Sequence, residues 1–101
     1  MTARIIDEII AELVRQHRLW GDQSHLPTGT GQPGDARMAD LYRQACDSAT
    51  ADGTLTWRHV LAEEFWEVLA ATTDEGLEIE LVQLAAVCVQ ILEVLRQHGP
   101  K

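Results

Sequence analysis

Aromatic and sulfur-containing side chains are scarce in this sequence. Its 101 residues include three Trp, one Tyr and one Phe, and its two cysteines, Cys46 and Cys88, stand far apart. Two cysteines at this separation match neither a disulfide framework nor the paired spacing of a zinc site. The sequence therefore predicts no disulfide scaffold, and we expect Cys88, which lies in an apolar stretch, to be a core residue.

Basic residues are also few. Eight Lys and Arg stand against sixteen Asp and Glu, which gives a formal net charge of −8. Nonspecific binding to nucleic acid needs a basic surface that displaces counterions from the phosphates. The charge therefore argues against a nucleic-acid partner, but it allows a phosphate-bearing small molecule if a cation bridges the two negative partners.

Long hydrophobic runs are missing as well. The longest, residues 84–89, is far shorter than the roughly 20 residues that cross a bilayer. The opening MTARIIDEII lacks the basic segment and apolar run of a signal peptide. We therefore predict no membrane partner and a cytoplasmic location.

What the sequence does contain is helical periodicity, and no segment is typical of a strand. Apolar residues recur at helical spacing in four segments, which are residues 3–19, 38–52, 57–71 and 72–98. Glycines and prolines make residues 20–35 a long loop. We predict an all-α fold in one domain, residues 1–101, arranged as a four-helix bundle whose last two helices form an antiparallel hairpin.

The starts of the last two helices carry capping signals. Thr56 is the expected N-cap of the third helix. Thr72 and Glu75 match a capping box for the fourth. The two helices are therefore expected to be joined by a very short link.

One carboxylate falls in an apolar setting when successive residues are placed about 100° apart around a helix. In the fourth predicted helix, Glu80 lies at the centre of the most apolar face in the chain. The apolar residues within about 60° of it are Leu77, Leu84, Val87, Ile91, Val94 and Leu95. An unpaired carboxylate there would be costly or would become neutral, so we expect Glu80 to pair with another charge or to bind a metal ion.

Three further acids belong to the third predicted helix. Glu63, Glu64 and Glu67 fall within an arc of about 100° that borders its apolar face. Taken alone, these three describe a solvated surface, and Glu80 alone could be a buried acid hydrogen-bonded to a Tyr, Trp or Arg. Because a hairpin would bring the two faces together, shared metal ligation by the four acids is the preferred interpretation.

Residues 81–92, LVQLAAVCVQIL, are apolar almost all the way round the helix. A helix of this kind is covered on every side in a folded protein. Three short partner helices cannot easily supply that cover. We therefore predict a homodimer or a homotetramer.

The acids also occur in a characteristic order. Glu63-Glu64-x-x-Glu67, followed after twelve residues by Glu80-x-x-Gln83, resembles the EExxE…ExxD signature of the MazG-like, all-α nucleoside triphosphate pyrophosphatases. Members of that family are oligomeric helical bundles that hydrolyse nucleoside triphosphates to the monophosphate and pyrophosphate with Mg²⁺. The resemblance implies an enzyme of this type, dependent on Mg²⁺ with Mn²⁺ as an alternative.

The resemblance further implies roles for single residues. Glu64, Glu67 and Glu80 would be metal ligands, with Gln83 as a further oxygen ligand. Glu63 would be either a ligand or the base that orients the attacking water. Gln83 stands where the family has aspartate, and it carries no charge. An alternative is therefore a catalytically weak or inactive helical dimer that binds a nucleotide or a partner protein.

Candidate contacts to the nucleotide come from the start of the chain. The segment from Trp20 through His25, which includes Gln23, is loosely similar to the tryptophan, glutamine and histidine segment of MazG proteins. Trp20 could stack on a base or simply plug the end of the first helix. Arg15 and Arg18 are candidates to neutralise phosphate charge, with a surface role as the alternative.

Overall fold

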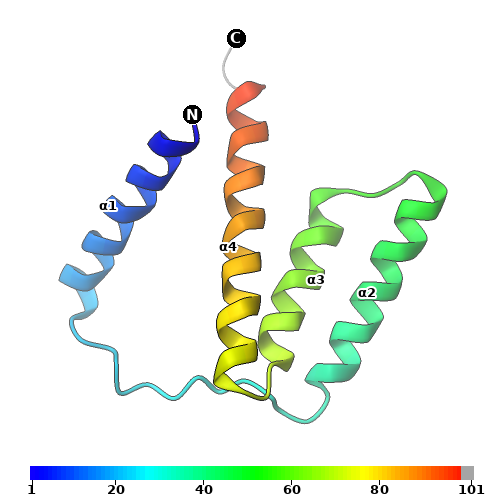
Figure 1. Ribbon diagram of the computed structural model, residues 1–101, viewed down its shortest axis with the longest axis horizontal. Helices are drawn as coiled ribbons and strands as arrows, with labels where there is room; N and C mark the ends of the chain where they lie inside the picture. The colour runs from blue at the N-terminus through cyan, green and yellow to red at the C-terminus, as the bar shows by residue number, and fades with distance from the viewer. Residues whose placement is uncertain (99–101) are drawn as a thin grey trace. The chain divides into compact units, whose positions relative to one another are not determined.

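A computed structural model describes residues 1–98, and all regular secondary structure in that range is helical (Figure 1). The helices are α1 (Thr2–Trp20), α2 (Asp35–Asp52), α3 (Trp57–Ala70) and α4 (Asp74–Gln97). For this part of the chain the predicted all-α class, with four helices and no strand, is confirmed. None of these helices combines the length and the apolar character that crossing a membrane requires.

The described chain forms two compact parts. The terminal part contains residues 1–28 and 89–98, and the central part contains residues 29–88. Helix α4 runs through both, because its first half belongs to the central part and its second half to the terminal part.

In the terminal part, α1 is tied to the end of α4 by polar contacts. Arg96 forms an ion pair with Glu8, in which Nη2 donates to Oε1 at 3.2 Å. Thr2 donates a hydrogen bond to Glu93. Ile5 is fully buried, whereas the other isoleucines of the predicted apolar stripe remain exposed. The first turns of α1 are therefore better anchored than the rest of its apolar face.

In the central part, α2 and α3 pack against each other in opposite directions (Figure 1). Small side chains on α2 allow the close approach, since Ala39, Cys46 and Ala49 are all buried. The rings of Tyr42 and Trp66 stack between the two helices, with centroids 6.3 Å apart and planes inclined by 12°. This packing fixes which face of α3 is turned toward α2.

The helix ends are set by specific caps. Thr56 caps α3 as predicted, and its backbone N–H donates to His59 Nδ1 at 3.1 Å in a capping box. The predicted cap of α4 is wrong by one residue, because Gly76 N donates to Thr73 Oγ1 at 3.1 Å. Thr73, directly before the first helical residue, is the N-cap in place of Thr72.

The segment before α2 is fixed to the end of α3. Gly31 N donates to the Leu69 carbonyl oxygen at 2.7 Å, and Gly31 has a φ of +74°. A Cβ at this position would lie 3.2 Å from the Ala71 carbonyl oxygen. Glycine therefore suits both the backbone conformation and the close approach.

One side of α3 and α4 stays open in the central part. Leu61 and Phe65 of α3, with Leu84 and Cys88 of α4, line a groove of 860 Å³. The expectation that Cys88 is a core residue is wrong, since its side chain is exposed in this groove. The periodicity of α4 showed that Cys88 lies on an apolar face but not what covers that face.

Candidate functional site

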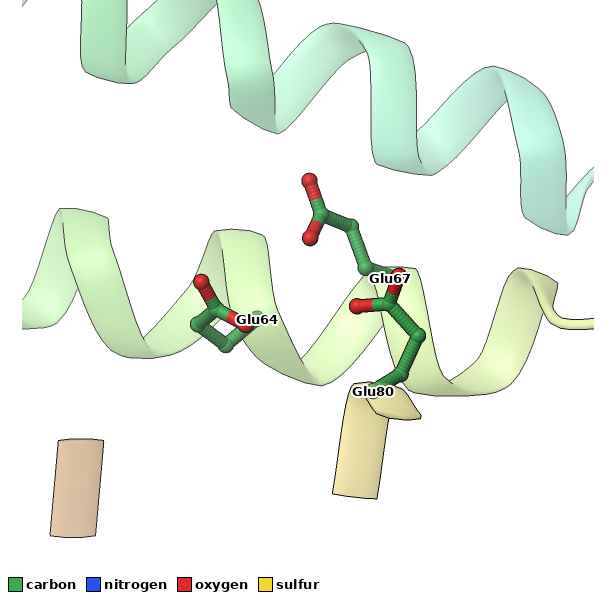
Figure 2. A group of neighbouring side chains, drawn as sticks. All are labelled: Glu64, Glu67 and Glu80. Atoms are coloured by element: carbon green, nitrogen blue, oxygen red, sulfur yellow. The ribbon is translucent and has the colours of Figure 1, made fainter. Parts of the chain in front are cut away.

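Three carboxylates from two helices converge in the central part. Glu64 and Glu67 lie one turn apart on α3, and Glu80 lies in the second turn of α4. One carboxylate oxygen from each residue lies within 4.8 Å of the other two. Figure 2 shows Glu80 reaching from α4 toward Glu67. The short link between α3 and α4 reverses the chain and so brings the two acidic segments together.

The group is half-buried and short of hydrogen-bond partners. Glu64 Oε2 and Glu80 Oε2 are both shielded from solvent, and neither has a hydrogen-bond partner among the described residues. Two unit charges about 4.8 Å apart repel by roughly 3 kcal/mol at an effective dielectric constant of about 20. Orphaned buried oxygens and mutual repulsion together favour a cation or a proton in this position.

The pKa values follow from this crowding. Burial, reinforced by the charges of Glu64, Glu80 and Glu63, raises the pKa of Glu67 to about 7. Burial, followed by the charges of Glu80 and Glu63, also raises the pKa of Glu64. At neutral pH the metal-free group therefore retains part of a proton.

Glu63 lies next to the group without belonging to it. Burial, a hydrogen bond to the Glu63 carboxylate and its charge raise the pKa of the Cys46 thiol on α2 to about 12. Glu63 is thus turned toward α2, while its charge still acts on Glu64 and Glu67.

Arg43 is a member of the site that the sequence did not reveal. Its Nη2 lies 4.0 Å from Glu67 Oε1, and its Nη1 lies 2.7 Å from Asp40 Oδ1 on its own helix, α2. Arg43 and Glu67 are 24 positions apart, so no local spacing connects them. Only the pairing of α2 with α3 places this guanidinium beside the acids.

Gln83, the predicted fourth oxygen ligand on α4, has an exposed side chain. It lines a shallow hollow with Glu78, Ile79 and Val82, none of which is among the three converging acids. Its surroundings are therefore those of a surface residue.

The predicted nucleotide contacts belong to the terminal part of the chain. Arg15 pairs with Glu12 at 2.6 Å, and Arg18 is exposed. Trp20 is the last residue of α1 and is 57% exposed, so it is not a buried plug. Gln23 lines a hollow with His17 and Asp22. Their roles in binding a nucleotide stay predictions.

The donor set of the three acids fits a hard divalent cation. All available ligand atoms are carboxylate oxygens, which Mg²⁺ and Mn²⁺ prefer over the nitrogen and sulfur donors typical of zinc. Two oxygens of the group, Glu64 Oε2 and Glu80 Oε2, have no hydrogen-bond partner among the described residues that a cation would have to displace. Residues Glu64, Glu67 and Glu80 could therefore hold one such ion between α3 and α4.

Compared with known proteins, the chain matches no protein-family model, no curated protein and no solved structure. The resemblance to MazG-like enzymes therefore depends on the acidic signature and the helix order alone.

Proposed function

We propose that this protein is a divalent-cation-dependent nucleoside triphosphate pyrophosphohydrolase, which converts a nucleoside triphosphate and water into the monophosphate and pyrophosphate. The observation that carries the proposal is the convergence of Glu64, Glu67 and Glu80 within 4.8 Å, from two helices, with buried oxygens that lack partners. The two shielded oxygens without hydrogen-bond partners distinguish this group from an ordinary solvated acidic surface. The order of these acids along the chain supplies the substrate class.

In this proposal the three converging acids hold Mg²⁺ or Mn²⁺ as the resident cation. The bound cation would neutralise polyphosphate charge and polarise the phosphoanhydride that breaks. The resemblance implies that Glu63, whose charge acts on Glu64 and Glu67 from outside the group, would be the base for the attacking water. The water oxygen then bonds to phosphorus, the bond between the α and β phosphates breaks, and pyrophosphate leaves.

The test is pyrophosphate release from a panel of ribo- and deoxyribonucleoside triphosphates with Mg²⁺ or Mn²⁺. We expect release by the wild type, and a loss of about 100-fold or more in kcat/KM for Glu67→Gln and Glu80→Gln. Glu78→Gln is the matched control, because Glu78 lies on the same helix with an exposed side chain. If the wild-type protein releases pyrophosphate from none of the nucleotides, the proposed pyrophosphohydrolase activity is refuted.

A second candidate is a helical protein that binds a nucleotide or a partner protein with little or no turnover. The neutral, exposed Gln83 favours it, because it stands where the family signature has a charged aspartate, which weakens the attraction for a cation. This candidate predicts that Mn²⁺ raises the melting temperature of the wild type, and less so that of Glu80→Gln, while no pyrophosphate appears.

We further propose that the protein is a homodimer or a pair of such dimers, as expected of an oligomeric bundle of this type. Support comes from large apolar side chains that stay exposed on α3 and α4, such as Phe65, Leu81 and Val82. The 860 Å³ groove beside Phe65 adds a concave apolar surface. A second copy of the chain would bury both the exposed apolar side chains and the groove.

A further inference from the structure

A cavity of 420 Å³ adjoins two of the three acids in the central part, between α2, the end of α3 and the start of α4. Glu67 and Glu80 form part of its lining. Much of the rest consists of small side chains, including Ala39, Ala70 and Gly76. The cavity therefore offers open volume directly beside two candidate metal ligands.

Arg43 supplies the positive charge in the lining of this cavity. Its contact with Glu67 is an ion pair at 4.0 Å, which is too long for a hydrogen bond. Of its five N–H donors, one is engaged by Asp40 at 2.7 Å. Its side chain is half exposed, and among residues 1–98 no further hydrogen bond occupies its remaining donors, so they can meet a ligand in the cavity.

A guanidinium beside metal-binding acids works against a site for metal alone, since it competes with the cation for Glu67. The same arrangement suits a ligand that brings its own negative charge. Phosphate oxygens match the planar fork of arginine and form short, charge-assisted hydrogen bonds with it. The cavity thus presents carboxylates to a cation and a guanidinium to an anion bound with it.

We propose that Arg43 is a substrate-binding residue that holds the terminal phosphates of the nucleotide and so selects polyphosphates over monophosphates. The inference rests on the proposed function and deepens it. In the free protein Arg43 stays paired with Glu67. When the polyphosphate enters, the guanidinium turns from Glu67 to the phosphate oxygens and leaves that carboxylate to the cation.

The test compares Arg43→Ala and Arg43→Lys with wild-type protein by calorimetric titration in Mn²⁺. The probes are a nucleoside triphosphate analogue with a methylene group between the α and β phosphates, pyrophosphate, and the nucleoside monophosphate. We expect Arg43→Ala to bind the analogue and pyrophosphate about 10- to 100-fold more weakly, with monophosphate binding unchanged. Arg43→Lys should be intermediate, because lysine keeps the charge but loses the fork.

Arg37→Ala is the matched control, since it removes the same charge from an exposed position of α2 outside the cavity lining. Thermal melting with Mn²⁺ alone provides a second readout. Arg43→Ala should keep, or increase, the rise in melting temperature that Mn²⁺ gives the wild type. If Arg43→Ala loses the Mn²⁺ response, the residue acts by positioning Glu67, and the inference is overturned.

Failure of the inference can be told apart from failure of the proposed function. If wild-type protein releases pyrophosphate but Arg43→Ala binds the analogue equally well, the inference alone is wrong. If wild-type protein neither binds the analogue nor releases pyrophosphate from any nucleotide, both fall together.

Discussion

Glu67 carries the most informative single charge in the molecule. Its pKa is raised from the ordinary value of 4.5 to about 7, chiefly by burial and then by the neighbouring acids. Over that pH interval the folded, metal-free protein binds a proton that the unfolded chain has released. Because the folded state holds more protons there, its stability falls as pH rises from 4.5 to about 7.

Glu67→Gln should remove the part of this dependence on pH that comes from Glu67, while the raised pKa of Glu64 keeps its own contribution. The amide cannot ionise, so we expect the metal-free variant to gain up to about 3 kcal/mol relative to wild type above pH 7, and little below pH 4.5. Urea unfolding in a chelating buffer at several pH values measures the difference. An equal loss of stability with pH in both proteins would show that Glu67 titrates normally.

Some members of the site can be recognised from the sequence, and others only from the structure. Apolar residues surround Glu80 on its own helix, and the 3.6-residue periodicity of the sequence shows this without the structure. The structure places it in the converging group. Arg43 shares no helix with these acids, and its role could be recognised only when α2 was placed against α3.

At the scale of elements, the cap of α4 fixes the residue at which the helix that carries Glu80 begins. Thr73 accepts the hydrogen bond of Gly76 N, whereas no side-chain cap from Thr72 to this helix is seen in the described residues. The sequence pattern predicts Thr72 as the cap, one residue before the threonine that caps the helix in the structure.

Thr73→Ala should therefore cost about 1 kcal/mol of stability, and Thr72→Ala only a few tenths. The pair is its own control, because both variants remove the same hydroxyl and methyl groups from neighbouring positions. Thermal or urea unfolding of the two proteins gives the comparison. Should Thr72→Ala be the more damaging change, the predicted capping box with Glu75 would be the correct one.

The helix boundaries themselves were largely predictable. The third helix begins at Trp57 directly after Thr56, as its capping signal predicts, and α1 ends where the glycine- and proline-rich segment starts. Local chemistry controls these positions, since caps and chain-breaking residues act over only a few residues.

At the scale of the whole molecule, α4 carries apolar side chains that nothing in the described chain covers. Val82 is 70% exposed, and it lies in the stretch of residues 81–92 that the sequence expected to be covered on every side. We propose that a second copy covers it. A carboxylate buried there without a partner would oppose that association.

Val82→Glu should shift a wild-type dimer to monomer at the same protein concentration, which light scattering coupled to gel filtration measures directly. Gln97→Glu adds the same charge at the last residue of α4 and should leave the dimer intact. Wild-type protein that stays monomeric at every concentration would refute the dimer, and Val82 would then be an ordinary surface residue.

By itself the sequence determined the all-α class, most helix boundaries and the candidate status of Glu64, Glu67 and Glu80, because periodicity and caps are encoded within a few turns of chain. Tertiary structure decided which polar groups meet. It brought the three acids within 4.8 Å, turned Glu63 toward Cys46, and left Gln83 and Cys88 exposed. It also placed Arg43 of α2 beside Glu67 of α3, since contacts between helices depend on which faces of the helices pack together.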